Sequence, residues 1–432
     1  MTDKVSKTFC ILPWIHLHSW PNGTAKLCCL SDFSGDVGDL TQETITEVQN
    51  NDTMKSIRKS LLKGERVDFC KSCYKLEDAG IQKSWRRDFN TNFDHLIEDR
   101  IKNTLEDGTL KDPKIYYMDF RFSNLCNLEC RTCGGDLSSS IAARGSDRAL
   151  TRNVKEEYKA KGILSKSENI IAYSGAPKYN NYFNEEIKDQ LHTVEQFYFA
   201  GGEPLLQPEH AQILKYLVDN KLFKKTLIYS TNATSFVYKK HDFFEDWKKF
   251  QAVNVIHSID GHHKVLEYIR QNGIHDKIYP NLEKCIAQPN IKAEICHVLS
   301  IYNAWEFFDF LEYIDDYIPQ LNSFHLNFAF GEHNAIGLLP DFAKKELFKK
   351  YEEQFETNES CKKFLLWHGE HTDKIANFKE MVENQYPSDR KRFIWEEFID
   401  RTNRWDKLYN KKLEDHIPWL ADVIRRYESG QR

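Results

Sequence analysis

From Ile115 onward, strand-like and helix-like stretches alternate along the chain. Six runs rich in β-branched and aromatic residues predict strands, and apolar residues at helical spacing predict helices between most of them. The predicted strands are residues 115–123, 194–200, 226–230, 252–259, 293–301 and 323–330. The clearest helix, residues 208–221, has apolar residues at Ile213, Leu214, Leu217 and Val218. Repeated strand–helix units predict an α/β fold with a parallel sheet or barrel.

Polar side chains gather where several of these strands end. Asp119 and Arg121 alternate with apolar residues on the first strand, Asn232 follows the third, and Ser258 and Asp260 end the fourth. Because the carboxyl ends of parallel strands meet at one rim, we expect these side chains to contribute to one site.

The region before the barrel reads as a small hairpin followed by a helix. Asn22-Gly23 between two alternating runs predicts a two-residue hairpin turn, which would pair Cys28 with Leu17 and Cys29 with His16. Residues 52–63 predict a helix that ends at Gly64. The apolar face of this helix comprises Met54, Ile57, Leu61 and Leu62.

These patterns predict three parts of the chain. Residues 1–112 form the hairpin module with a linker helix, residues 113–331 the barrel, and residues 332–432 a helical extension. Residues 136–193 are longer than one crossover needs and predict an insertion that covers the site, with a helix at 154–160 and a break at 174–177. We expect the aromatic residues of the extension to pack it onto the barrel: Phe364, Trp367, Phe393, Trp395, Phe398, Trp405 and Trp419.

Composition narrows the class of protein. The chain has 432 residues, enough for a large core, and a net charge of -5, which disfavours a nucleic-acid binder. No apolar run approaches the roughly 20 residues that span a bilayer, and no apolar signal segment follows the N-terminus. We therefore expect a cytoplasmic protein with no nucleic-acid or membrane partner.

The 11 cysteines are clustered, which in a reducing compartment indicates metal binding or catalysis. Cys126, Cys130 and Cys133 lie at C-x3-C-x2-C spacing directly after the first predicted strand. Three thiolates on one short loop can hold three corners of a 4Fe-4S cluster and leave one iron open for chemistry. Cys285, Cys296 and Cys361 are scattered, and we expect each to be a buried, inert thiol.

This loop, followed by Gly201-Gly202-Glu203-Pro204 after the second strand, resembles the radical S-adenosylmethionine (radical SAM) superfamily over residues 115–331. The resemblance implies a partial (β/α)6 barrel, a 4Fe-4S cluster on the three thiolates, and SAM chelating the open iron. It also implies an electron donor such as flavodoxin or ferredoxin. The alternative is a zinc site, which usually needs four protein ligands.

The resemblance also implies contacts with SAM. Gly201, Gly202, Glu203 and Pro204 form the motif that takes the SAM amino group, and two glycines allow a close backbone approach. The matching positions near the ribose are Asn232, Ser258 and Asp260, and the candidate for the SAM carboxylate is Arg270. Thr132 stands where the family often has an aromatic residue that covers the adenine.

The N-terminal cysteines resemble a second module of the same superfamily. Cys10 and Cys28, followed by Cys70-x2-Cys73, are similar to the twitch module, a shorter relative of the SPASM domain. This implies a second, auxiliary 4Fe-4S cluster on Cys10, Cys28, Cys70 and Cys73, here before the barrel rather than after it. Four cysteines that end in C-x2-C also suit zinc. Cys28 and Cys29 compete as ligand, and the Gly-x4-Cys spacing favours Cys28.

The resemblance implies an enzyme that cleaves SAM to a 5′-deoxyadenosyl radical and abstracts a substrate hydrogen. With only nine residues before Cys10, no peptide-recognition winged helix precedes the hairpin, which favours a small polar, sugar- or nucleotide-like substrate. The alternatives are an enzyme that modifies ribosomal peptides and a non-catalytic iron–sulfur or zinc protein. The Gly-Gly-Glu motif disfavours the last, because electron transfer alone has no use for an amino-group site.

Overall fold

The structure is a computed structural model that describes residues 5–31, 35–78, 84–143, 185–321, 323–329, 333–365, 374–383 and 391–431. Packing divides the chain into two compact units. The first comprises Met1–Asn127, Gly134–Ser230 and Val237–Asn254, and the second comprises Leu128–Cys133, Thr231–Phe236 and Val255–Arg432. The predicted boundaries at 112 and 331 are not tested by this division and remain a prediction.

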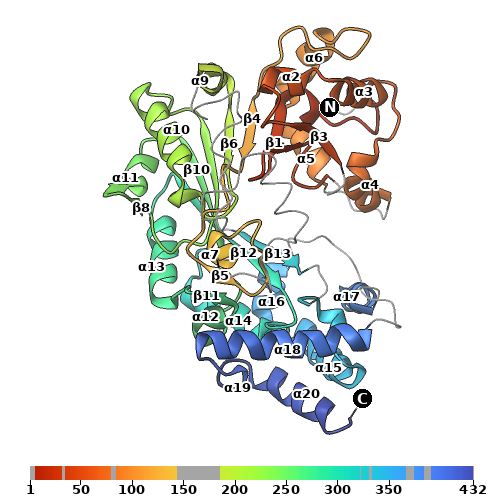
Figure 1. Ribbon diagram of the computed structural model, residues 1–432, viewed down its shortest axis with the longest axis vertical. Coiled ribbons are helices and arrows are strands. Elements are labelled where there is room, and N and C mark those ends of the chain that lie inside the picture. Colours follow the sequence, from red (N-terminus) through yellow and green to blue (C-terminus); the bar gives the residue numbers. More distant parts are fainter. Residues whose placement is uncertain are drawn as a thin grey trace. The chain divides into compact units, whose positions relative to one another are not determined.

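The first unit begins with the hairpin module and continues into barrel strands (Figure 1). Its N-terminal elements are α1 (Leu12–Ile15), β1 (His16–Ser19), β2 (Thr24–Lys26), β3 (Asp36–Asp39), α2 (Ile45–Gln49), α3 (Asp52–Leu62), η2 (Asp68–Cys70), α4 (Lys71–Asp78), α5 (Trp85–Asn92) and α6 (Asp94–Lys102). The elements that follow are β4 (Tyr117–Phe120), α7 (Ser139–Ala143), α9 (Glu185–Thr193), β6 (Gln196–Phe199), η3 (Pro204–Leu206), α10 (Pro208–Asp219), β7 (Thr226–Thr231), β8 (Val237–Tyr238), β9 (His241–Asp242) and α11 (Phe243–Trp247).

Six strands of this unit lie side by side in one sheet in the order β7-β6-β4-β1-β2-β3, and β8 and β9 pair separately. β7, β6, β4 and β1 are parallel, whereas β2 and β3 pair antiparallel. The hairpin module thus extends the edge of the barrel sheet, since β1 pairs with β4 from His16↔Tyr117 to Ser19↔Phe120. β3, at the end of the ladder, was not predicted from the sequence.

The hairpin is confirmed, but its predicted register is wrong by one residue. The observed pairs are His18↔Lys26 and Ser19↔Ala25, and this register carried further would set Cys28 opposite His16. The turn has three residues, with Trp20 N–H donating to Thr24 O at 2.9 Å. Pro21 has the fixed φ that a first turn position needs, and Gly23 takes the left-handed conformation (φ 84°) that closes a three-residue loop.

The helix after the hairpin is confirmed as α3, with one exception on its predicted apolar face. The Asn51 side chain caps its first turn by accepting from Met54 N–H at 3.1 Å. Met54, Ile57 and Leu61 are buried, but Leu62 is 40% exposed.

The second unit holds the remaining barrel strands and the C-terminal helices. β10 (Ala252–Ser258) runs from the first unit into the second. The other elements are β5 (Glu129–Cys130), α12 (His263–Ile269), β11 (Arg270–Gln271), α13 (His275–Ile286), β12 (Ile291–Leu299), α14 (Phe307–Tyr317), β13 (Ser323–Phe328), η4 (Ile336–Leu338), α15 (Asp341–Thr357), α16 (Glu359–Leu365), α17 (Lys374–Glu383), α18 (Lys391–Tyr409), α19 (Leu413–His416) and α20 (Pro418–Glu428).

All six predicted barrel strands are present, as β4, β6, β7, β10, β12 and β13. β12 and β13 pair in parallel from Glu294↔Ser323 to Leu299↔Phe328, and helices α13 and α14 lie between the strands in sequence. The predicted α/β class, with the strands of a partial (β/α)6 barrel and a helical C-terminal extension, is confirmed.

The C-terminal extension packs largely through its aromatic residues. The buried members are Phe364, Trp395, Phe398 and Trp405, and Trp419 stacks on Trp305 with ring centroids 4.6 Å apart. Phe393 departs from this prediction because its side chain is 59% exposed. Trp367 and the predicted features at 154–160 and 174–177 lie outside the described residues. In the described part of the chain, no helix is both long and apolar enough to cross a bilayer.

Candidate functional sites

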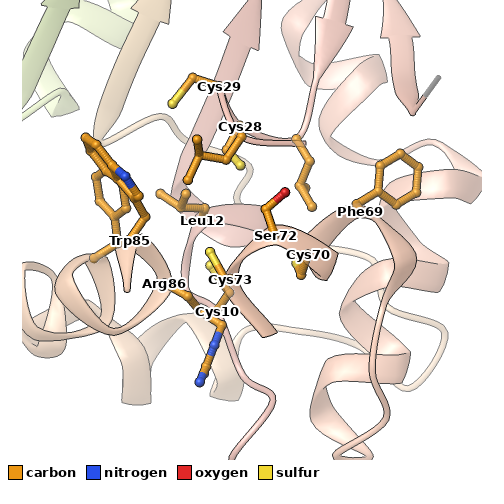
Figure 2. Close-up of a pocket in the computed structure, with 13 residues that line it drawn as sticks. Cys10, Leu12, Cys28, Cys29, Phe69, Cys70, Ser72, Cys73, Trp85 and Arg86 are labelled. Atoms are coloured by element: carbon orange, nitrogen blue, oxygen red, sulfur yellow. The ribbon is translucent and has the colours of Figure 1, made fainter. Parts of the chain in front are cut away.

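Five cysteines line one pocket in the first unit, namely Cys10, Cys28, Cys29, Cys70 and Cys73 (Figure 2). Cys10 precedes α1 and Cys28 follows β2, whereas Cys70 ends η2 and Cys73 lies in the first turn of α4. Leu12, Leu27, Phe69 and Phe89 supply the apolar wall of this pocket. The hairpin and the η2–α4 turn therefore bring together the four cysteines that the sequence assigned to the auxiliary cluster.

Burial keeps these thiols protonated when no cation is present. It raises the pKa of Cys28 to about 12 and that of Cys70 to about 11, and the charges of neighbouring thiolates raise both further. Burial also raises the pKa of Cys10 well above its usual value, with Cys70 as the largest charged contributor. Thiols that raise one another's pKa in this way suit a bound cationic cluster, which holds them as thiolates.

One cationic side chain, Arg86, opposes the negative charge of these thiolates. The Arg86 guanidinium is buried, donates to Phe9 O at 2.5 Å and pairs with Glu77 at 2.5 Å. Its charge lowers the pKa of Cys70 and Cys73, although burial outweighs it in both. Arg86 thus partly compensates the negative charge that four thiolates would bring.

The surroundings of Cys28 and Cys29 differ. The Cys28 thiol interacts with Cys70 and Cys73, whereas burial and the charges of Asp119 and Cys28 raise the pKa of Cys29. Figure 2 shows the Cys28 sulfur directed toward Cys10 and Cys73, and the Cys29 sulfur directed away from them. This geometry favours Cys28 as the fourth thiol, as the Gly-x4-Cys spacing does.

The donor set fits an iron–sulfur cluster by its chemistry, since such clusters are held by thiolates. Among the described residues, no group of three or more His, Cys, Asp or Glu is close enough to hold a single metal ion.

In the same unit, the Gly-Gly-Glu-Pro turn packs against the segment that leads to Cys126. Gly202 N–H donates to Ser123 O at 3.3 Å, and Glu203 N–H donates to Leu125 O at 2.7 Å. A Cβ on Gly202 would lie 2.3 Å from Leu125 O, so no side chain fits. The Glu203 carboxylate is buried and accepts from Leu205 N–H at 3.1 Å.

The backbone of Cys126 is held by two serines at the start of α7. Ser139 Oγ accepts from Cys126 N–H at 3.2 Å, and Ser140 Oγ donates to Cys126 O at 2.7 Å. Asn124 adds a bond from its side chain to Gly135 O at 2.7 Å. The first cysteine of the loop is therefore fixed on both sides, and its thiol remains half-buried.

Cys130 and Cys133 belong to the second unit, where they lie beside a buried ion pair. Cys130 pairs with Arg270 across the β5–β11 ladder, and Arg270 Nη1 lies 3.9 Å from its sulfur. Arg270 Nε lies 2.8 Å from Oδ2 of the fully buried Asp260. Burial alone would lower the pKa of Arg270, but the charges of Asp260 and of the thiols Cys130, Cys296 and Cys133 raise it.

This arrangement bears on two predicted SAM contacts. Asp260 Oδ1 accepts from Val298 N–H at 2.9 Å, so both carboxylate oxygens are engaged within the protein. A carboxylate bound in this way orients Arg270, whose Nη1 lies 3.9 Å from the Cys130 sulfur. Asp260 thus orients Arg270, so the two residues form one pair rather than two separate SAM contacts.

Other predicted residues lie apart or were missed. Asn232 Oδ1 accepts from Thr234 N–H at 3.0 Å in a local turn, and Ser258 ends β10 half-buried. Cys296, expected to be inert, faces Arg270 and Asp260 and accepts from Asn327 Nδ2 at 3.0 Å. Cys296 lies two residues after Glu294 on β12. The sequence alone does not show which face of this strand turns inward, so it could not single out Cys296.

Comparison with known proteins gives one domain match and several distant structures. Residues 10–74 match the SPASM family, described as an iron-sulfur cluster-binding domain. Native anSMEcpe with bound AdoMet and Cp18Cys peptide is 19% identical, with a TM-score of 0.32 over 54% of this chain and 58% of that one. SuiB of Streptococcus suis bound to S-adenosylmethionine is 15% identical, with a TM-score of 0.35 over 67% and 59%.

A third structure, TYW1 with a lysine-pyruvate adduct bound, is 17% identical, with a TM-score of 0.27 over 53% of this chain and 70% of that one. The chain spans about three fifths of the length of anSMEcpe and SuiB. At these TM-scores the similarity carries no argument about fold or function. A comparison with curated proteins gives no match. The domain match at residues 10–74 includes Cys10, Cys28, Cys70 and Cys73, and it supports an iron-sulfur cluster-binding module in this part of the chain.

Proposed function

We propose that the chain is a radical SAM enzyme with two 4Fe-4S clusters. Cys126, Cys130 and Cys133 hold the first and leave its fourth iron to SAM. A cluster held at this loop would supply the electron for the cleavage of SAM to methionine and a 5′-deoxyadenosyl radical, and that radical would abstract a substrate hydrogen. The proposal is supported above all by the bond from Glu203 N–H to Leu125 O, which joins the SAM-binding turn to the segment before Cys126.

The residues around the loop have separate tasks in this proposal. The Gly201–Pro204 turn takes the SAM amino group, because Gly202 lets the backbone approach closely and Glu203 offers a buried carboxylate. Arg270, oriented by Asp260, takes the SAM carboxylate. Asn232 and Ser258 remain proposed contacts of the ribose.

The second cluster is held by Cys10, Cys28, Cys70 and Cys73 and has no open iron. We infer that a cluster held there would accept the electron left on the substrate after hydrogen abstraction, so that the substrate would lose two electrons in all. Its position in a module that continues the barrel sheet through β1 and β4 supports this role. An external electron donor of the flavodoxin or ferredoxin type would reduce the first cluster, and the proposed location is the cytoplasm.

The proposed substrate is a small polar molecule, sugar- or nucleotide-like. A peptide substrate is the second candidate, because the sequence leaves open an enzyme that modifies ribosomal peptides. The two are distinguished by adding sugars, nucleotides or short cysteine- and serine-containing peptides to the reduced enzyme. The true class is the one that accelerates the formation of 5′-deoxyadenosine.

Anaerobic reconstitution tests the enzyme itself. We expect about eight irons and eight sulfides per chain, and 5′-deoxyadenosine after reduction with dithionite in the presence of SAM. Cys126→Ala should lose 5′-deoxyadenosine, whereas Cys73→Ala should keep it with about four irons. Stoichiometric zinc, or iron without 5′-deoxyadenosine, would instead support a non-catalytic metal protein.

A further inference from the structure

The two residues beside Cys130 carry buried charges that the cluster itself does not use. Glu129 and Arg131 are 3% and 1% exposed, although both types are rarely buried without partners. Neighbouring residues of a strand face opposite sides, and the ladder continues past β5 because Arg131 N–H donates to Ile269 O at 2.8 Å. Glu129 and Arg131 therefore face away from the side on which Cys130 meets Arg270.

Arg131 is bound to the C-terminal helix α18 through Asp406. Its Nη2 donates to Asp406 Oδ1 at 2.5 Å, and Tyr268 OH donates to the same oxygen at 2.7 Å. The guanidinium carbon also lies 3.7 Å from the centroid of the Tyr268 ring. Asp406 thus pairs with the positive charge of Arg131 and holds the orientation of its guanidinium group.

Glu129 is bound to the same helix one turn later. Tyr409 OH donates to Glu129 Oε2, and Asn272 Nδ2 donates to Oε1 at 3.2 Å. Asp406 and Tyr409 are three residues apart on α18, so their side chains share one face of the helix. That face therefore binds the side chains of both neighbours of Cys130.

A purely structural attachment does not require this polar network. A buried ion pair seldom stabilises a protein more than apolar residues of the same size would, but it specifies one geometry. Groups of this kind behind a metal ligand orient the ligand and set how tightly the metal is held.

We infer that Asp406 and Tyr409 are positioning residues for the proposed cluster: α18 sets the direction of the Cys130 thiol through Arg131 and Glu129. The inference rests on the proposed function, because it takes Cys130 as a cluster ligand. The C-terminal extension is thus part of the cluster site as well as a packing element.

The test uses the full chain in a Cys73→Ala background, so that iron reports the loop cluster alone. Into it are placed Asp406→Asn, Tyr409→Phe and the control Asp400→Asn. Asp400 lies on the same helix, but its exposed carboxylate pairs with Arg404 at 2.8 Å. Tyr409→Phe keeps the ring that packs on Trp405 and removes only the hydroxyl. It therefore tests the positioning role even if Asp406→Asn does not fold.

The readouts are iron per chain, the rate at which bathophenanthroline removes iron, and the change that SAM causes in the electron paramagnetic resonance spectrum. We expect iron removal to be roughly tenfold faster in Asp406→Asn, faster in Tyr409→Phe, and unchanged in Asp400→Asn. Equal rates and equal spectra in all three variants would overturn the inference. If the parent itself binds no iron at the loop or its spectrum ignores SAM, the proposed function fails instead.

Discussion

At the scale of single residues, Gly202 is the position where one methyl group would do most harm to the proposed SAM site. Its Cβ would meet Leu125 O at 2.3 Å and the carbonyl carbon of Asn124 at 2.7 Å, both backbone atoms that cannot turn aside. We predict that Gly202→Ala lowers SAM affinity by about tenfold or more. The added methyl group would push the Gly201–Pro204 turn away from the segment before Cys126. Calorimetric titration with SAM measures this. Gly430→Ala, where nothing lies within 4 Å, should bind SAM as the parent does.

A second residue-scale prediction concerns acid. Burial, with a smaller effect of His241, lowers the pKa of His210 to about 3, whereas an unfolded histidine titrates near 6.5. The folded state therefore keeps His210 neutral, and stability is complete above pH 6.5 and falls as the pH drops toward 3. At pH 5 the loss is about 2 kcal/mol.

His210→Phe removes this pH-dependent contribution to stability. It also removes the hydrogen bond between His210 Nε2 and Tyr229 OH at 3.1 Å. We expect it to cost about 1 kcal/mol at pH 8 and to shrink the difference between pH 8 and pH 5 by about 2 kcal/mol. Urea unfolding at both pH values measures this. Substitution of the exposed His192 by Gln should leave the full pH dependence; an equal response of both variants would contradict the prediction.

At the scale of elements, the hairpin decides which neighbouring cysteine serves the auxiliary cluster. The thiol of Cys28 interacts with Cys70 and Cys73, whereas Cys29 lies toward Asp119 and Arg121. We predict that Cys28→Ser loses about four irons per chain and Cys29→Ser keeps them. Iron and sulfide analysis after reconstitution provides the measurement, and the reverse pattern would assign the site to Cys29.

The same hairpin shows how far the sequence predicts these elements. Alternating apolar residues and Asn22-Gly23 were enough to predict a hairpin, because both signals are local. The register depended on whether Pro21 belongs to the turn. Counting this one residue as part of the turn shifts every pair of residues along the hairpin by one. The bonds from Asp406 and Tyr409 to β5 join residues more than 270 positions apart, and only the folded chain reveals them.

At the scale of the whole molecule, the hairpin module behaves as part of the barrel sheet and not as an appendage. β1 is the parallel neighbour of β4 over four residue pairs, and Tyr117 of β4 stacks on His16 with centroids 4.5 Å apart. His18 Nδ1 also lies 2.7 Å from Asp119 Oδ2, and both side chains are almost fully buried.

Removal of residues 1–112 would therefore expose the edge of β4 and leave the Asp119 carboxylate without its partner in a largely apolar face. We predict that residues 113–432 alone aggregate, and that co-expression with residues 1–112 restores a soluble complex. Size-exclusion chromatography compares the fragment with the full chain and with a chain that lacks only residues 429–432. A monomeric 113–432 fragment that melts within a few degrees of the full chain would mean that the boundary at 112 separates independent domains.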